Sequence, residues 1–191
     1  MPKVIITFDL ETIQDPEEIK TENEIRRFKH KPILAVCQIS CDLCNSDDDC
    51  QICGEKEYVF VGESCIKQFV SYIYDELAFI AKEKECSIYC ISHNGSAFDT
   101  QFVLHELVRR NFRELSNPLI QGRKIFKLEV NGVKWIDSLL MFPLPLAKLP
   151  KAFNLPTELN KGVFPYMFRP EDPLSYIGPL PDIKYFGIEY M

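Results

Sequence analysis

The sequence predicts an α/β fold with a mixed sheet, and three patterns indicate this class. The run from Val4 to Phe8 is apolar and rich in β-branched residues, as in a buried strand. Cys86 to Ser92 is a second such run, and a short polar segment links it to helically spaced apolar residues between Phe102 and Val108. Asn131-Gly132 separates two further β-prone segments and predicts a tight hairpin.

The other elements follow from periodicity and from the positions of Pro and Gly. In chain order we expect a first strand extending to Glu11, a partly helical connection from Glu17 to Phe28, strands at Ile33 to Ser40 and Glu57 to Val61, an amphipathic helix at Cys65 to Lys82, and a short helix at Leu146 to Phe153. Beyond Leu155 the chain is rich in Pro and Gly and reads as an irregular extension.

Composition restricts the class of protein. The chain has 191 residues, of which 46% are hydrophobic and 12% aromatic, so it can form a real core and is not a disordered protein. It has no apolar run long enough to cross a bilayer and no signal peptide, so we expect an intracellular protein of the nucleus or cytoplasm, neither secreted nor membrane-bound. The net charge of −6 does not by itself indicate a nucleic-acid-binding protein.

Three carboxylates are placed where they could meet. Asp9 and Glu11 are two residues apart at the end of the first strand, so they share one face of it. Asp99 follows the strand ending at Ser92, at the carboxyl edge where α/β folds place ligands. Hard oxygen ligands of this kind suit Mg²⁺ or Mn²⁺. The alternatives are two solvated acids at a strand end and, for Asp99, a helix N-cap.

The cysteines form a second pattern. Cys41 and Cys44, then Cys50 and Cys53, are two Cys-x-x-Cys pairs within an insert at about 41–54, and this spacing suits one structural Zn²⁺ held by four thiolates. Disulfides and unliganded thiols are the other interpretations, although disulfides are disfavoured inside cells. Four further cysteines lie in apolar segments and are expected in the core: Cys37, Cys65, Cys86 and Cys90.

Four motifs together resemble a known family. Phe8-Asp9-Leu10-Glu11-Thr12 and the segment from His93 to Asp99 are similar to the first and second exonuclease motifs of family B DNA polymerases. Asp137-Ser138-Leu139 and Lys161-Gly162-Val163-Phe164 resemble two motifs of the protein-primed branch, which viruses, linear plasmids and self-synthesising transposons encode. Four motifs in the right order are far more specific than any one of them.

This resemblance implies a ribonuclease H-like 3′→5′ exonuclease fold with a zinc-knuckle insertion. It implies proofreading removal of nucleotides from single-stranded DNA 3′ ends by a two-metal mechanism, with Mg²⁺ or Mn²⁺ at Asp9, Glu11 and Asp99. Lys161 would orient the scissile phosphate. The partners implied are the primer 3′ end and a terminal priming protein. The positions that match the family's DNA contacts are Thr12, His93, Asn94, Phe98, Phe102, Ser138 and Leu139.

The chain also departs from the family pattern. The fourth acid belongs to a later Tyr-x-x-x-Asp motif, and Tyr185 to Glu189 offers only a weak match, because Pro and Gly disfavour a helix there. The polymerase palm motifs do not occur. We therefore expect an exonuclease-like domain over residues 1–155, and an extension over 156–191 that leads towards a missing third motif and polymerase region. The alternative function is a non-catalytic module that binds nucleic acid or protein.

Overall fold

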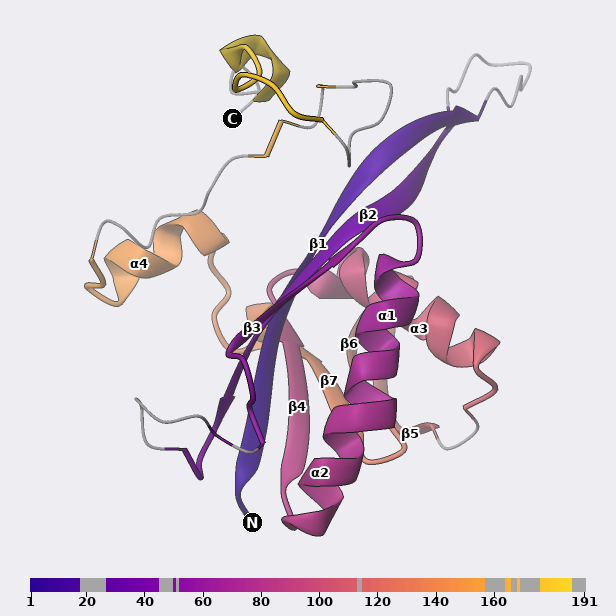
Figure 1. Cartoon of the computed structure of the whole chain (residues 1–191), viewed down its shortest axis with the longest axis vertical. Coiled ribbons are helices and arrows are strands. Elements are labelled where there is room, and N and C mark those ends of the chain that lie inside the picture. Colours follow the sequence, from indigo (N-terminus) through magenta and orange to yellow (C-terminus); the bar gives the residue numbers. More distant parts are fainter. Residues whose placement is uncertain are drawn as a thin grey trace.

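The computed structural model describes residues 1–17, 27–44, 50, 52–112, 115–156, 164–165, 168 and 176–186. Within this part of the chain the strands form one seven-stranded mixed sheet in the order β3-β2-β1-β4-β7-β6-β5 (Figure 1). The strands are β1 (Lys3–Glu17), β2 (Arg27–Cys41), β3 (Glu57–Val61), β4 (Ser87–Ser92), β5 (Leu115–Gln121), β6 (Lys124–Val130) and β7 (Val133–Asp137). The mixed α/β class predicted from the sequence is confirmed.

The central strand β1 sets the two faces of the sheet. It pairs antiparallel with β2 and parallel with β4, and β4 pairs parallel with β7. Its even-numbered residues, Val4 to Leu10, are buried, while Thr7 and Asp9 are exposed. This alternation is the period of two expected of a strand with one face in the core.

Helices cover the buried face. A continuous helical segment comprises α1 (Cys65–Ser71), a π-helical turn at Tyr72–Leu77 and α2 (Ala78–Glu83), and α3 (Asp99–Arg109) packs against α1. Phe8 of β1 contacts Phe69 of α1 and the edge of the fully buried Trp135 of β7, with ring centroids 5.2 and 5.5 Å apart. These large aromatic contacts join the helices to the sheet at the centre of the core.

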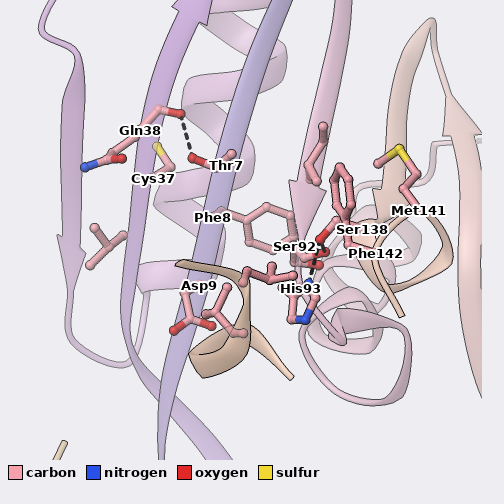
Figure 2. Close-up of a pocket in the computed structure, with 14 residues that line it drawn as sticks. Thr7, Phe8, Asp9, Cys37, Gln38, Ser92, His93, Ser138, Met141 and Phe142 are labelled. Carbon is pink, nitrogen blue, oxygen red and sulfur yellow. Dashed lines mark hydrogen bonds between the residues drawn. The ribbon is translucent and has the colours of Figure 1, made fainter. Parts of the chain in front are cut away.

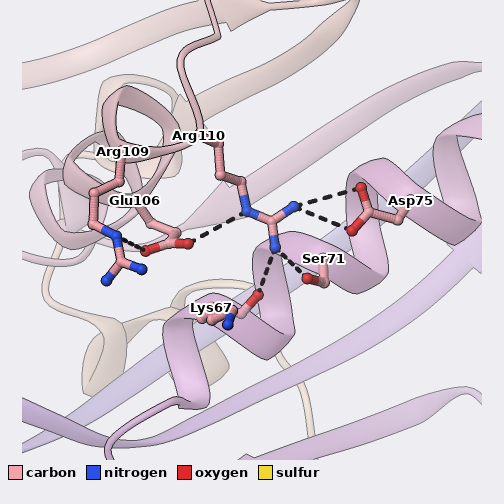
Figure 3. Close-up of polar contacts among 6 residues, drawn as sticks. All are labelled: Lys67, Ser71, Asp75, Glu106, Arg109 and Arg110. Carbon is pink, nitrogen blue, oxygen red and sulfur yellow. Dashed lines mark hydrogen bonds and ion pairs between the residues drawn. The ribbon is translucent and has the colours of Figure 1, made fainter.

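The half-buried Arg110, which follows α3 directly, fastens this helix to the first helical segment (Figure 3). The guanidinium of Arg110 donates to both carboxylate oxygens of Asp75, at 3.5 and 3.2 Å, and to Glu106 at 3.3 Å. It also donates to the hydroxyl of Ser71 and, at 3.1 Å, to the carbonyl of Lys67. The planar guanidinium thereby satisfies a buried carboxylate and a helix carbonyl together. The contacts hold in place the helix that begins with Asp99.

Several sequence expectations are confirmed and others need correction. The strand at Glu57 to Val61, the helix from Cys65 and the hairpin all occur, and Asn131 and Gly132 both have positive φ, as a type I′ turn requires. The helix expected between Glu17 and Phe28 is wrong at its ends, because Glu17, Arg27 and Phe28 belong to paired strands. Residues 18–26 lie outside the described part of the chain.

The region after β7 is only partly regular. The short helix predicted at Leu146 to Phe153 occurs as a 3₁₀ turn at Leu146–Lys148 followed by α4 (Leu149–Ala152). Pro150 lies near the start of α4, where a proline is tolerated. A further 3₁₀ turn spans Ile183–Phe186. Strand β5 was not anticipated. No helix in the described residues combines the length and apolarity that crossing a bilayer requires.

Candidate exonuclease and metal sites

The two acids of the first motif lie on the face of β1 opposite the buried core residues Phe8 and Leu10. Asp9 is exposed and Glu11 half-buried, whereas Phe8 and Leu10 between and beside them are buried. Across the antiparallel pair they face Val36 and Leu34 of β2, and a register shift follows between Glu11 and Thr12. Asp9 and Glu11 therefore lie on the same face of β1, as predicted. The irregularity directly after Glu11 changes the direction of the strand.

Asp99 approaches this pair from the second motif. It is the first residue of α3, and Phe98 is the N-cap, so the alternative interpretation of Asp99 as the N-cap is wrong. Its side chain is 6% exposed. Burial, then the negative charge of Asp9, and to a smaller extent those of Glu11 and Asp137, raise the pKa of Asp99 to about 7. The acids of the first motif therefore influence the protonation of Asp99 in the second motif.

The turn between β4 and α3 is shaped by two residues. Asn94 has φ of 62°, in the left-handed region that asparagine tolerates better than most residues. A Cβ on Gly95 would lie 1.9 Å from the Ser92 hydroxyl oxygen and 3.2 Å from Oδ2 of Asp99, so only glycine fits. The hydroxyls of Ser92 and Ser96 are buried beside this turn, and neither has a hydrogen-bond partner among the described residues.

Asp137, the last residue of β7, anchors the same turn. Its carboxylate accepts hydrogen bonds from the backbone N–H groups of Asn94 at 2.8 Å, Ser96 at 3.0 Å and Leu139 at 2.8 Å. Although burial would raise the pKa of this carboxyl, these N–H donors outweigh burial and lower it. Asp137 is 1% exposed and acts as an ionised clamp on the segment that carries the second motif.

His93 is fastened to the chain through both ring nitrogens. Nε2 donates to the carbonyl of Leu144 at 2.8 Å, and Nδ1 lies 2.9 Å from the hydroxyl of Ser138. The Ser138 hydroxyl is also 3.2 Å from the carbonyl of Ser92. The Leu144 carbonyl can only accept from Nε2, and the single hydroxyl proton of Ser138 can go either to the Ser92 carbonyl or to Nδ1. His93 and Ser138, which come from two different motifs, therefore lie together and connect β4 with the segment after β7.

Three aromatic rings form a row beside these acids. Phe98 and Phe102 meet edge to face with centroids 5.1 Å apart, and His30 of β2 packs edge-on against Phe98 at the same distance. Nδ1 of His30 lies 3.1 Å from the hydroxyl of Thr12. Both phenylalanines are half-buried, and Phe102 also packs against the hydrophobic core.

A cavity of about 480 Å³ adjoins Asp9 (Figure 2). Asp9 and Thr7 of β1 lie on one side of it, and Met141 and Phe142 lie on the other, with His93 between them at the end of β4. The apolar side chains around it suit the flat face of a base or another aromatic group, and the carboxylate adds a charged end.

The four cysteines of the insert come together at the other end of β1. Sγ of Cys41 is 3.6 Å from Sγ of Cys50, Sγ of Cys44 is 3.8 Å from Sγ of Cys53, and all four sulfurs lie within 4.8 Å of one another. The group could hold a metal ion. Among the described residues no carboxylate cluster as tight as this one is found. Cys37, Cys65 and Cys90 are buried in the core as expected, and Cys86 is half-buried.

Two predicted positions cannot be placed. Lys161 and Glu189 both lie outside the described residues, so the expected phosphate-orienting lysine and the weak fourth-acid match remain predictions. Conversely, sequence reasoning overlooked two residues that the structure brings to the site. Asp137 had a visible signal, a carboxylate at the end of a predicted strand within a recognised motif. His30 lies in a basic stretch ahead of the strand predicted to begin at Ile33, and nothing in its spacing linked it to the two motifs.

Comparisons with known proteins agree with these observations. The family model of DNA polymerase type B, organellar and viral, matches residues 80–191. Among curated relatives, a probable DNA polymerase of Agaricus bitorquis is 28% identical over 130 residues, covering 65% of this chain and 16% of the relative. Those of Ascobolus immersus and Neurospora intermedia are each 34% identical, over 106 and 111 residues, covering 49% and 52% of this chain and 8% and 11% of the relatives.

The chain therefore spans less than a fifth of the length of these relatives. The family match covers more than half of the chain, and it includes the second motif, Asp137 and Ser138. This chain belongs to the organellar and viral type B family of DNA polymerases.

Proposed function

We propose that this chain is the exonuclease portion of a protein-primed type B DNA polymerase, with a ribonuclease H-like fold over residues 1–155. It would bind the 3′ end of single-stranded DNA and hydrolyse it. The observation that carries the proposal is that Asp9 and Glu11 share one face of β1, while Asp99, buried at the start of α3, lies within reach of the negative charges of both. Three mutually repelling carboxylates are the donor set that a hard divalent cation stabilises.

The donor set fits Mg²⁺ or Mn²⁺. Asp9, Glu11 and Asp99 would hold the metal, and the buried hydroxyl of Ser92 lies beside Asp99. Bound metal would supply an activated water and stabilise the leaving 3′ oxygen. Asp137 would keep Asn94 and Ser96 in position, and Asn94, which is exposed, would contact the DNA. Lys161 is proposed to orient the phosphate.

The DNA-binding role is proposed for residues that surround these acids. Phe98 and Phe102 would stack on bases, which is the usual sequence-tolerant grip on single strands. Thr12, His93, Ser138 and Leu139 border the same edge and would contact the primer end. The extension over 156–191 is proposed to lead towards the third exonuclease motif and the polymerase region, where a terminal priming protein would engage the full-length enzyme.

Metal and DNA binding can be separated in one set of measurements. Calorimetry with Mn²⁺ should detect binding by the wild-type chain and not by Asp9→Ala, while Glu83→Ala, at the exposed end of α2, serves as the control. Equal Mn²⁺ binding by wild type and Asp9→Ala would refute the site.

The expected rate of DNA hydrolysis depends on how many acidic residues hold the metal ions. With three ligands instead of four, hydrolysis should suffer more than binding, because two-metal catalysis depends on close placement of both ions. We expect the chain to bind an oligothymidylate in a salt-sensitive manner and to degrade it slowly or not at all. A longer chain carrying a Tyr-x-x-x-Asp motif should degrade it, and Asp99→Ala should abolish that activity. Binding without hydrolysis in the longer chain would instead favour the non-catalytic module.

We also propose that the four-cysteine group holds one structural Zn²⁺. Four sulfurs at about 2.3 Å from a tetrahedral zinc are about 3.8 Å from one another, close to the separations of 3.6 and 3.8 Å found here. Burial raises the pKa of Cys50, but backbone N–H groups of Cys53 and Ile52 and the neighbouring thiols outweigh it and bring the pKa to about 7. Burial and the neighbouring thiols raise the pKa of Cys53, so the four thiols share their protons unevenly when no cation lies between them.

The position of this group indicates a structural role. Cys41 pairs with Val4, and a rise of about 3.3 Å per residue places this end of β1 about 17 Å from Asp9. Cys53 and Ile52 are part of the hydrophobic core, and Gly54, with φ of 53°, donates to the carbonyl of Cys50 at 2.8 Å to close the second knuckle. Elemental analysis should find about one zinc per chain. Metal-free protein with intramolecular disulfides would refute the proposal.

A further inference from the structure

We propose that His30 is a positioning residue that locks the aromatic surface of the DNA site to the first acidic motif. The inference rests on the proposed function, because it concerns how the single strand is gripped. His30 lies in no recognised motif, and its strand was predicted to begin only at Ile33. Its contacts nevertheless reach residues of both exonuclease motifs.

The register of the β1–β2 ribbon brings His30 to Thr12. The register shift after Glu11 places Thr12 opposite Pro32, and His30, opposite Gln14, becomes its diagonal neighbour. The His30 Nδ1 atom then lies 3.1 Å from the hydroxyl oxygen of Thr12. Thr12 is 9% exposed, so the contact is shielded from water and fixes the orientation of both side chains.

The imidazole ring of His30 also contacts Phe98, which in turn contacts Phe102. The rings of His30 and Phe98 are almost perpendicular, at 88°, with centroids 5.1 Å apart. Phe98 meets Phe102 in the same way, at 82° and 5.1 Å. Edge-to-face geometry of this kind is the favoured arrangement of aromatic pairs. The three rings therefore form a row that runs from β2 to the first turns of α3.

His30 supplies both halves of this link with one small ring. The hydrogen bond to Thr12 needs a ring nitrogen, and the contact with Phe98 needs an aromatic edge. A ring held in its binding orientation loses less conformational freedom when a base stacks on it. His30 therefore acts on affinity through Phe98, without any requirement to touch DNA itself.

The test uses two variants that remove one half of the link each. His30→Phe keeps an aromatic ring and loses the hydrogen bond, whereas His30→Gln keeps a polar group and loses the ring. His105→Gln, at an exposed position on α3, is the matched control. Binding of a fluorescein-labelled oligothymidylate is measured by anisotropy without Mg²⁺ or Mn²⁺. His30→Gln should weaken binding about three- to tenfold, His30→Phe by less, and His105→Gln by less than about twofold.

A second measurement reads ring position without DNA. Aromatic NMR signals of Phe98 and Phe102, assigned with Phe98→Leu and Phe102→Leu, should move in His30→Gln and stay in place in His105→Gln. Unchanged ring signals, or unchanged affinity of both His30 variants, would overturn the inference while leaving the proposed function standing. If the wild-type chain itself fails to bind the oligothymidylate, the proposed function is refuted, and the DNA role of His30 with it.

Discussion

Replacing Asp99 by asparagine should make the metal-free chain more stable, and increasingly so as pH rises. Burial, together with the charges of Asp9 and Glu11, raises the pKa of Asp99 from its ordinary 3.8 to about 7 in the folded chain. Between these two values the folded chain holds a proton that the unfolded chain has released. Stability therefore falls as pH rises from about 4 to about 7, and the asparagine variant escapes this loss because it has no proton to release.

The size of the effect follows from the pKa difference. Each pKa unit corresponds to about 1.4 kcal/mol, so a difference of about three corresponds to roughly 4 kcal/mol in total. About 2.5 kcal/mol of this should be lost between about pH 5 and about pH 8, since part is already lost at the lower pH. The stability advantage of Asp99→Asn over the wild type should grow by that amount across the interval.

The assay is urea unfolding followed through Trp135, the single tryptophan of the chain, which is 1% exposed. Wild type, Asp99→Asn and the control Glu83→Gln are unfolded at about pH 5 and about pH 8 in buffer without Mg²⁺ or Mn²⁺. Adding Mn²⁺ at the higher pH should stabilise the wild type and leave Asp99→Asn largely unaffected, because binding needs the ionised carboxylate. Parallel pH dependence in wild type and Asp99→Asn would show that Asp99 is not held in the environment described above.

Three further changes test the surroundings of the site. Gly95→Ala should lower the free energy of unfolding by about 1–3 kcal/mol and weaken Mn²⁺ binding, because the added Cβ collides with Ser92; normal stability and metal binding would contradict the tight turn. Arg110→Ala should cost about 3 kcal/mol in urea unfolding, since it removes a partner from the buried carboxylate of Glu106, whereas exposed Arg109→Ala should cost under about 1 kcal/mol. Cys44→Ser should lose bound zinc by elemental analysis and lower the melting temperature; retention of one zinc per chain would exclude Cys44 as a ligand.

The local patterns of the sequence predicted those parts of the fold that depend on periodicity and turns. The alternation from Val4 to Leu10 identified the buried face of β1 and hence the common face of Asp9 and Glu11. Asn131-Gly132 identified the β6–β7 hairpin, because few residue pairs adopt two positive φ angles. The Cys-x-x-Cys spacing likewise identified the thiol cluster, since each pair is closed by a local turn.

Strand pairing corrected the predicted connection after β1. The segment near Glu17 and Phe28 favoured a helix by its own composition, yet β1 and β2 pair as a long ribbon through these residues. Backbone hydrogen bonds to a neighbouring strand outweigh weak local helix propensity. The edge strand β5 was missed for the same reason, because its pairing with β6 comes from outside the segment.

What the sequence determined by itself was the kind of chemistry: three acids in two motifs, four thiols in two pairs, and membership of a polymerase family through matching motifs. What only the tertiary structure decided was the set of side chains that support them. Asp137 clamps the turn at Asn94, and His30 reaches both Thr12 and Phe98, from strands far away in the chain. Such contacts depend on strand order and on a one-residue register shift, and neither is encoded in the spacing of residues along a single segment.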